Sequence, residues 1–545
     1  LVGSEMCIRD RKYIYLSILT CILTVFGCEN DFDAKIYGSL STTNFPQSEA
    51  DYESYMMDCY IPFTLTWAYN WGSSNQHNFY VAEGGINRML DTPSDICAPW
   101  TLGGSWGGPC IYMAQGQFED MKYASTYSNI LPSHFDKVRD ITRMTKIIGT
   151  LEESTLLSDK KKQELMAESR LLRGMTMFYL LHFYGPVPVI LDPTLVGNLE
   201  AEKNMVRPTL DEMTKYITAD LEYAAEHMVE TQSEVGRYTA DYARFCLMRH
   251  YLCEGAHMDG YYQKAYNIYH QFTGSYSLFT SGKNPYLDQF KIANEFNCET
   301  IMAVSCGSDA DGSGKRGNFN PLSWYLLPYD VSKYDDKGNP TPFVNQGGGW
   351  GQYYNVDPQF YETFEENDMR KEGILTSYYS AWYGWVTKED IGVKWDGYIL
   401  NKYPIETETA FQGTDYPLAR WADVLLMYAE ADVRLNKTVS TSAIDCVNQV
   451  RHRAGLADLP AEKTASVNDF LDALLEERGH EFYYEGHRRI DLIRFNKYYT
   501  IMDAIGCTPT SQYFPIPNYA VDQATDMGYT LTQYFTRPDY DGPQR

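Results

Sequence analysis

The stretch YPLARWADVLLMYAEADVRLN, residues 416–436, carries the clearest helix signal in the chain. Four of its residues follow the W-x2-L-G-x2-Y spacing of a tetratricopeptide helix, with Val for Leu and Leu for Gly: Trp421, Val424, Leu425 and Tyr428. A second helical segment follows at 441–453 and ends before Gly455. Because paired helices in series bury a shared apolar face, the stretch predicts a helical-repeat scaffold.

An earlier helix-rich zone spans about residues 133–272, and the zone around the opening stretch spans about 417–497. In the earlier zone, five residues at +4 and +3 spacings share one helix face: Ala167, Leu171, Gly174, Phe178 and Leu181. The small residues on this face allow two helices to approach closely. The glycine and prolines of YGPVPVI end the helix, and we expect further helices at 209–230, 238–255 and 260–272.

The remaining stretches, residues 40–132 and 273–414, are rich in Gly, Pro, Asn, Tyr and Trp and lack helical periodicity. Nine of the ten tryptophans lie in them, whereas Trp421 lies in a predicted helix. These stretches are too long and too aromatic to be linkers. We therefore expect ordered loops, held on the helical scaffold, that carry the binding function.

The N-terminal segment indicates export and a lipid anchor. We expect residues 1–10 to be a translated sequencing artefact and residues 11–27 to be a signal peptide. An apolar run too short to span a membrane ends at Gly27 and Cys28, as in a bacterial lipobox. Cys28 is therefore the expected lipidation site, and the chain is expected to be anchored rather than spanning. An ordinary signal peptide with an incidental cysteine is the alternative.

The composition limits the partners of the chain. It has 545 residues, with 72 Asp and Glu against 46 Lys and Arg, which gives a net charge of −26. Such a field repels nucleic acid and anionic membrane surfaces, so both are excluded as binding partners. Aromatic residues make up 15% of the chain. Many can belong to a Tyr-rich core, but aromatic rings also suit ligands that are partly polar and partly flat.

The segment HEFYYEGH, residues 480–487, invites comparison with a metalloprotease, but HExxH requires histidine where Tyr484 stands. We interpret the segment as structural, with helical spacings that allow ion pairs among Glu477, Arg478, Glu481 and Glu485. Gly486 is expected to end this helix. Carboxylate pairs of a glycosidase cannot be singled out among 72 acidic residues. We predict no catalytic residues, no metal site, no cofactor and no enzymatic activity, and leave structural calcium open.

Nine cysteines follow Cys28, and none forms a CxxC pair. Cys97 with Cys110, or Cys298 with Cys306, can form loop disulfides in an oxidising compartment. The sequence leaves the pairing open.

Four stretches resemble signatures of the SusD/RagB family, and they occur in the family's order. They are AESRLLRGMTMFYLLHFYGPVPVI (167–190), YPLARWADVLLMYAEADVRLN (416–436), AIDCVNQVRHRAGL (443–456) and LLEERGHEFYYEGHRRIDLIRF (474–495). Shorter stretches that also resemble the family are FEENDMR (364–370), KYP (402–404) and YFPIPN (513–518). With the lipoprotein signal, the likeness covers nearly the whole chain.

The resemblance implies a mainly α fold at 28–545, in which four tetratricopeptide-like helix pairs carry a large, loop-rich, aromatic ligand-binding insertion. It implies a surface-exposed lipoprotein of the Bacteroidetes outer membrane that is not an enzyme. Such proteins hold a glycan over a SusC-like TonB-dependent transporter, which is the implied partner. Some members capture peptides instead.

In the family, the glycan platform draws on loops before the first helix pair and on the central insertion. In this chain, aromatic residues with polar neighbours lie in both places. The predicted ligand-binding residues are Trp100, Trp106, Trp324, Tyr325, Trp350, Asp95, Asn320 and Gln352. Their rings can stack on sugar C–H faces while the polar groups bind hydroxyls. For any one of these tryptophans, burial within the loops is an equal alternative.

Two rival functions remain. RagB-like peptide capture can use the same loops. A tetratricopeptide scaffold that binds other proteins predicts contacts on the helices instead, and the long Trp-rich loops argue against it as the sole function. The net charge of −26 favours a neutral glycan over a polyanionic one.

Overall fold

The computed structural model describes residues 45–63, 78–81, 84–98, 108–118, 134–204, 206–307, 320, 322–345, 349, 352, 354–406 and 412–536. The chain divides into two compact units, residues 1–52 and 53–545. The boundary falls within helix α2 (Glu49–Met57). All the remaining elements belong to the second unit. The residues of the predicted signal peptide and Cys28 lie outside the described residues.

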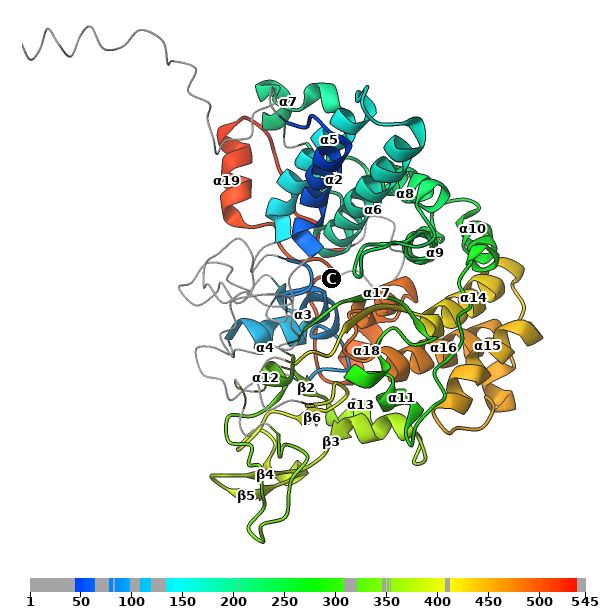
Figure 1. Cartoon of the computed structure of the whole chain (residues 1–545). Helices are drawn as coiled ribbons and strands as arrows, with labels where there is room; N and C mark the ends of the chain where they lie inside the picture. Colours follow the sequence, from blue (N-terminus) through cyan, green and yellow to red (C-terminus); the bar gives the residue numbers. More distant parts are fainter. Residues whose placement is uncertain are drawn as a thin grey trace, which may run out of the picture. The chain divides into compact units, whose positions relative to one another are not determined.

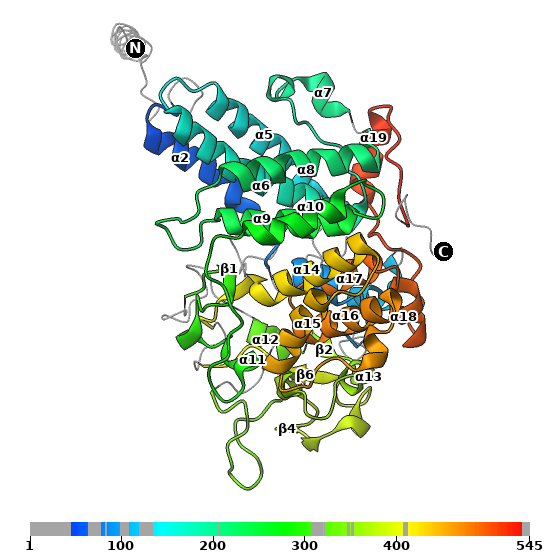
Figure 2. The same ribbon diagram turned by 90° about the vertical axis from the view of Figure 1, so that its right-hand side faces the viewer.

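Helices that pack in chain order form the first part of the scaffold (Figures 1 and 2). They are α5 (Val138–Glu152), α6 (Asp159–Tyr184), α8 (Leu210–His227), α9 (Ala240–Glu254) and α10 (Tyr261–Ile268). The predicted close approach occurs at Gly174, where an added Cβ would lie 3.0 Å from Leu221 Cδ2 of α8. Helix α6 begins after Ser158, whose side chain accepts from Lys161 N, and it ends at Gly185 with φ +75°.

Helix α14 (Trp421–Asn436) continues the stack, because it packs on α10 and α9 as well as on its own partner α15 (Thr441–Arg453). Helix α16 (Val467–Phe482) then packs against α14, α15 and α17. The remaining helices of this part are α17 (Arg488–Arg494), α18 (Tyr498–Ala504) and α19 (Asn518–Asp526). The mainly α fold class is therefore confirmed, and the predicted helices at 209–230, 238–255 and 441–453 are α8, α9 and α15.

Short elements fill the loop-rich part. Its helices are α3 (Ile86–Asp91), α4 (Gly108–Gln115), α11 (Pro285–Asp288), α12 (Leu322–Leu326) and α13 (Pro358–Glu362), and α7 (Leu199–Lys203) lies in the loop before α8. Short 3₁₀ segments are Asp58–Phe63, His134–Lys137, Pro193–Leu195, Tyr269–Gln271, Ile292–Asn294, Met369–Gly373, Lys388–Asp390 and Ala461–Thr464.

Three small antiparallel sheets accompany these helices, which the expectation of loops alone had missed. Strand β1 (Thr300–Val304) pairs with β7 (Tyr416–Arg420), and β4 (Tyr378–Ser380) pairs with β5 (Gly384–Val386). The third sheet has the order β2 (Asn355–Val356), β6 (Tyr398–Leu400), β3 (Ile374–Leu375). Strand β7 runs directly into α14, so it links the loop-rich part to the helical scaffold.

A buried charge cluster, defined as Arg370, Arg420, Arg453, Lys402, Asp368, Glu299, Glu477, Glu481 and Glu485, lies where these parts meet. Arg420, at the end of β7, donates to Glu299 at 2.6 Å, to Glu481 at 2.8 Å and to Glu485 at 2.6 Å. Arg370 donates to Glu477 at 2.7 Å. Each of these side chains is at most 3% exposed.

The structural interpretation of residues 477–485 is confirmed, but two of its details are wrong. The ion pairs do not run along the helix: Arg478 binds Asp423 at 2.6 Å and Asp491 at 2.8 Å, both on other helices. Helix α16 also ends at Phe482 rather than at Gly486. Tyr484 takes a left-handed conformation with φ 57°. Its hydroxyl donates to Asn355 O of β2, so a tertiary contact stops the helix early.

We expect Arg420→Met to lower the free energy of unfolding by about 3–5 kcal/mol, because three buried carboxylates lose a shared partner. The urea midpoint followed by far-UV circular dichroism measures this. The matched control is Arg143→Met, which breaks a half-exposed pair with Asp140 at 2.9 Å and is expected to cost at most about 1 kcal/mol. Equal midpoints for the two variants would show that the cluster is not needed for stability.

The cluster also predicts that the free energy of unfolding depends on pH. Burial opposes ionisation of Glu485, but Arg420 and Lys402 outweigh it and lower its pKa to about 2. Since this pKa lies below that of the unfolded chain, the stabilisation is present above about pH 4.5 and is lost as the pH falls toward 2. The difference in unfolding free energy between wild type and Glu485→Gln should shrink by about 2 kcal/mol from pH 5 to pH 3. A difference that is constant over this range would contradict the lowered pKa.

Candidate functional site

The predicted ligand-binding residues fall into two groups. Trp100, Trp106 and Trp350 lie outside the described residues, and so does the side chain of Trp324, although its backbone belongs to α12. Asp95, Asn320, Tyr325 and Gln352 are described; Asp95 is partly buried and the other three are buried.

Asn320 and Tyr325 belong to the α12 region and are 1% and 3% exposed. The Asn320 side chain accepts from Leu322 N at 3.0 Å, and its backbone exchanges two hydrogen bonds with Gln412, at 2.8 and 2.9 Å. These contacts fix the start of α12. Direct contact of either side chain with a ligand stays a prediction.

Gln352 and Asp95 tie loops together. Gln352 is 4% exposed, has φ 53°, and donates from Nε2 to Gly397 O at 2.8 Å. Both carboxylate oxygens of Asp95 accept from Arg488, each at 2.7 Å. Cys97, close by, is a buried free thiol, and Cys298 is an exposed free thiol.

A group of strongly exposed aromatic rings lies elsewhere, on the aromatic hairpin, which we define as residues 378–386. Trp382, Tyr383 and Trp385 are 67%, 53% and 54% exposed. On the outer face, the rings of Tyr379 and Trp385 pair across the two strands with centroids 5.6 Å apart. Figure 1 shows β4 and β5 at the lower end of the loop-rich part, away from α5 and α8.

Local hydrogen bonds fix the turn that presents these rings. Ser380 Oγ accepts from the backbone N–H groups of Trp382 and Tyr383, each at 3.0 Å, and its hydroxyl donates to Asp330. Asp330 also accepts from Tyr378 OH at 3.1 Å. Gly384 supplies the positive φ, +74°, that the turn requires. The backbone of the turn is therefore fixed by the protein's own contacts.

Sequence reasoning missed this hairpin. The inner residues Tyr378, Ser380 and Val386 are buried, and the outer residues Tyr379 and Trp385 are not. This period of two is the strand signal that could have found it. Lys388 pairs with Glu362 at 3.3 Å and Lys394 with Asp390 at 2.6 Å, so both lysines that follow the hairpin already have partners. Flat, exposed rings suit stacking on a ligand with apolar faces.

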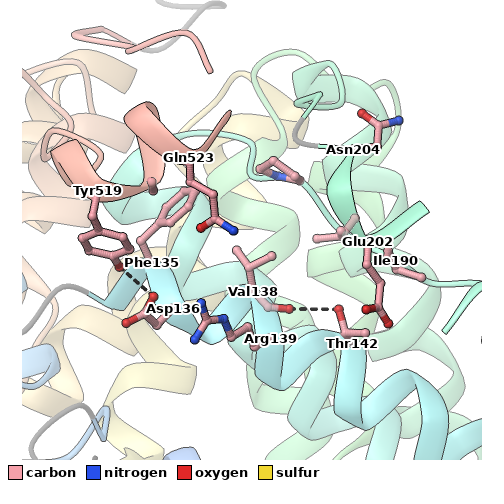
Figure 3. Close-up of a pocket in the computed structure, with 13 residues that line it drawn as sticks. Phe135, Asp136, Val138, Arg139, Thr142, Ile190, Glu202, Asn204, Tyr519 and Gln523 are labelled. Carbon is pink, nitrogen blue, oxygen red and sulfur yellow. Dashed lines mark hydrogen bonds between the residues drawn. The ribbon is translucent and has the colours of Figure 1, made fainter. Parts of the chain in front are cut away.

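A pocket of about 340 Å³ lies in the helical part, between α5 and α19 (Figure 3). Buried Phe135, Pro188 and Ala520 belong to its lining. At one end, Tyr519 OH donates to Asp136 Oδ1 at 2.6 Å. Polar side chains of Arg139 and Gln523 also line it. The pocket does not involve any predicted site residue.

The histidines of the 480–487 segment do not form a metal site. His480 Nε2 lies 2.7 Å from Thr363 Oγ1, and its ring stacks on Phe364 with centroids 4.0 Å apart. His487 faces Asp423 instead, and burial lowers its pKa to about 4. Within the described ranges, no group of three His, Cys, Asp or Glu side chains is placed to hold a metal ion. No helix in those ranges is long and apolar enough to cross a membrane.

The fold is a scaffold of helices packed in series that carries a loop-rich part with exposed aromatic rings. Family models match the chain in two regions: the SusD family over residues 297–535, and a family described as starch-binding and associating with the outer membrane over residues 111–252. The chain belongs to the SusD/RagB family.

Similar proteins agree with this assignment. SusD-like protein P25 of Formosa agariphila is 23% identical over 514 residues, 89% of each chain. Surface glycan-binding protein A of Bacteroides fluxus has the same fold, with a TM-score of 0.67 and 21% identity over 91% of this chain and 100% of that one. Surface glycan-binding protein A of Bacteroides thetaiotaomicron, solved in complex with laminarihexaose, has a TM-score of 0.64 and 21% identity over 89% of this chain and 99% of that one.

The exposure of the hairpin rings predicts that folding does not depend on them. We expect Trp382→Ala and Trp385→Ala to change the unfolding free energy by at most about 0.5 kcal/mol. Trp395→Ala, the buried control, should cost about 3–5 kcal/mol, because that ring is 2% exposed and packs on Tyr378 and Tyr398. Urea unfolding measures all three. If Trp385→Ala lowers the unfolding free energy as much as Trp395→Ala does, the outer face of the hairpin belongs to the core.

Proposed function

We propose that this protein is a non-catalytic, cell-surface lipoprotein that captures oligosaccharide or polysaccharide and delivers it to a SusC-like TonB-dependent transporter. The observation that carries the proposal is the aromatic hairpin, a rigid display of exposed rings in the loop-rich part of a SusD/RagB family chain. The laminarihexaose complex of a protein with the same fold supports a glycan as the ligand.

Binding would combine stacking with hydrogen bonds. A sugar ring has an apolar C–H face that packs on Trp or Tyr, while its hydroxyls require polar partners at the edges. The predicted residues Trp100, Trp106, Trp324 and Trp350 would form one stacking platform, and the hairpin would add contacts along a longer chain. Each contact is weak by itself, so several together, with the transporter as a second partner, would retain the glycan.

A binding role rather than catalysis is supported by how the acidic residues are used. A glycosidase requires two carboxylates on either side of the scissile bond in an accessible cleft. The most concentrated carboxylates that the structure describes, Glu299, Glu477, Glu481 and Glu485, are at most 3% exposed and are paired with arginines or Lys402. They stabilise the fold and are closed to substrate.

The anchor follows from the sequence. Lipidation at Cys28 would hold the protein on the outer membrane, in keeping with the family description of starch-binding proteins that associate with that membrane. A chain of net charge −26 would remain repelled from anionic lipid, so the lipid rather than the protein surface would supply the attachment.

The test is affinity electrophoresis of the protein begun after Cys28 on a polysaccharide panel that includes laminarin and starch. We expect at least one glycan to retard the protein. Trp100→Ala, Trp106→Ala, Trp324→Ala, Trp350→Ala and the double variant Trp382→Ala/Trp385→Ala are run beside it. At least one should raise Kd about three- to tenfold, which corresponds to one lost stacking contact.

Leu199→Ala is the matched control, because Leu199 is an exposed apolar residue of α7 in the helical part, 63% exposed. It should leave the retardation unchanged. Retardation that no tryptophan substitution alters would keep the glycan function but refute the aromatic platform. If no glycan retards the protein, the proposal is wrong and peptide capture replaces it.

A further inference from the structure

A small cavity opens beside the strand pair β1–β7, and it involves none of the predicted ligand-binding residues that the structure describes. Thr300 and Ala303 of β1, Pro417 of β7 and the loop 295–297 before β1 line it. Its volume is about 30 Å³, which is close to the share of one water molecule in the liquid. The cavity therefore admits a small head group, whereas a whole sugar ring is too large for it.

Two carboxylates from distant parts of the chain meet in this cavity. Glu295 Oε1 accepts from Asp415 N at 3.1 Å, and Asp415 Oδ1 accepts from Cys306 N at 2.8 Å. Asp415 is 8% exposed, and its second oxygen, Oδ2, is buried with no hydrogen-bond partner among the residues that the structure describes. A buried carboxylate oxygen without a donor is costly, so the cavity favours a ligand that supplies one.

The charge around the cavity is negative. Arg420 also lines it, but its guanidinium is already paired with three carboxylates of the buried charge cluster at 2.6 to 2.8 Å. Lys291, just before the loop, is paired with Asp288. Among the described residues that line the cavity or flank its loop, no cation is left to balance Glu295 and Asp415. The cavity therefore has the charge that complements a cationic ligand.

The protonation of the two carboxylates reflects the same missing cation. Burial and the charges of Asp415 and Glu406 raise the pKa of Glu295 to about 7. Burial raises the pKa of Asp415 to about 6. Without a cation, the pair therefore retains a proton close to neutral pH, and a cation that enters the cavity would displace it.

An aromatic ring that is open to solvent borders the cavity. Phe296 is 53% exposed, and Phe296 and Pro417 give the lining its apolar part. A phenyl ring attracts a cation to its face but has no atom that ligates a metal ion. Within the described ranges, no three His, Cys, Asp or Glu side chains are placed to hold a metal. These features favour an ammonium group on an aliphatic chain over a bare metal ion.

We propose that this cavity binds the ammonium group of a lysine side chain of a partner polypeptide. The ammonium has three N–H donors, and charge-assisted hydrogen bonds to Asp415 Oδ2 and to Glu295 would use two of them. The aliphatic stem would lie along Phe296 and Pro417. An arginine head group has four heavy atoms where the ammonium has one, so the small volume selects lysine.

A matched pair of peptides tests the charge requirement. The probe is acetyl-Gly-Lys-Gly-amide, and the control is the same peptide acetylated at the lysine Nζ, which removes the charge and keeps the stem. Saturation-transfer NMR and calorimetry on the protein begun after Cys28 should show that the lysine peptide binds at least about tenfold more tightly. Its affinity should also rise at least about tenfold from about pH 5.5 to about pH 7.5, as Glu295 and Asp415 lose their protons.

Substitutions locate the effect. Glu295→Gln and Asp415→Asn keep a carbonyl oxygen and the shape of the side chain, and each should weaken the lysine peptide about tenfold while leaving the acetylated peptide unchanged. Phe296→Ala should weaken the lysine peptide about threefold. Glu362→Gln, the matched control, removes one negative charge outside the cavity, from a residue paired with Lys388 at 3.3 Å, and should change neither peptide. Glycan retardation of Asp415→Asn should equal that of wild type, so this proposal and the proposed function can fail separately.

Three results would overturn the proposal: no binding of either peptide, equal affinity for both, or an affinity for the lysine peptide that neither Glu295→Gln nor Asp415→Asn reduces. The comparison of peptides uses the wild-type protein, so it holds even where a variant does not fold. Displacement of the lysine peptide by calcium at about 1 mM would also overturn it, because the cavity would then be a metal site. Tighter binding of a glucosamine oligomer than of the lysine peptide would do the same, because the cavity would then be a site for amino sugars.

Discussion

Arg420 occupies the point where the loop-rich part and the helical scaffold are joined. It is the last residue of β7 and the residue before the first turn of α14, and its guanidinium contacts Glu299, Glu481 and Glu485 at 2.6 to 2.8 Å. Because Glu299 lies beside β1 and the other two lie in or after α16, one buried side chain fixes the relation of a strand pair to two scaffold helices. Such charges are stabilising only as a complete set, since an unpaired member is strongly destabilising.

The buried charge cluster and the aromatic hairpin are held by different groups. The buried carboxylates are paired with arginines or Lys402, whereas the aromatic hairpin is held by Ser380 and Gly384 of its own turn and by Asp330, fifty residues earlier in the sequence. The exposed rings lie outside the buried cluster, so they can differ without disturbing it. The charge cluster and the displayed rings therefore depend on separate sets of contacts.

Local patterns were sufficient to predict the helices. The expected segment 441–453 coincides with α15, and 209–230 and 238–255 match α8 and α9 to within a few residues. The end of α16 was not predictable, because Tyr483 and Tyr484 are anchored to Arg370 O and Asn355 O, more than a hundred residues away. The ion-pair residues were identified correctly, but their partners come from distant segments that spacing along one helix does not reveal.

The site was harder to predict for a related reason. Tyr378 and Tyr379 are the same residue type, yet one is buried and the other faces outward. Composition identifies an aromatic loop, but only the strand register decides which rings are displayed. Composition likewise does not reveal that the polar side chains of Asp95, Asn320 and Gln352 bind the protein's own loops; their contact with a ligand stays a prediction.

The hairpin and the α5–α19 pocket differ in the chemistry they offer. The hairpin displays the rings of Trp382, Tyr383 and Trp385. The pocket combines an aliphatic wall with one cation, Arg139, and two carboxylates, Asp136 and Glu202. Because salt screens charges beyond about 8 Å, these three groups act on anything in the pocket more strongly than the net charge of −26 of the whole chain does. The hairpin offers flat rings and the pocket offers charges of both signs beside apolar groups, so the two places suit different chemistry.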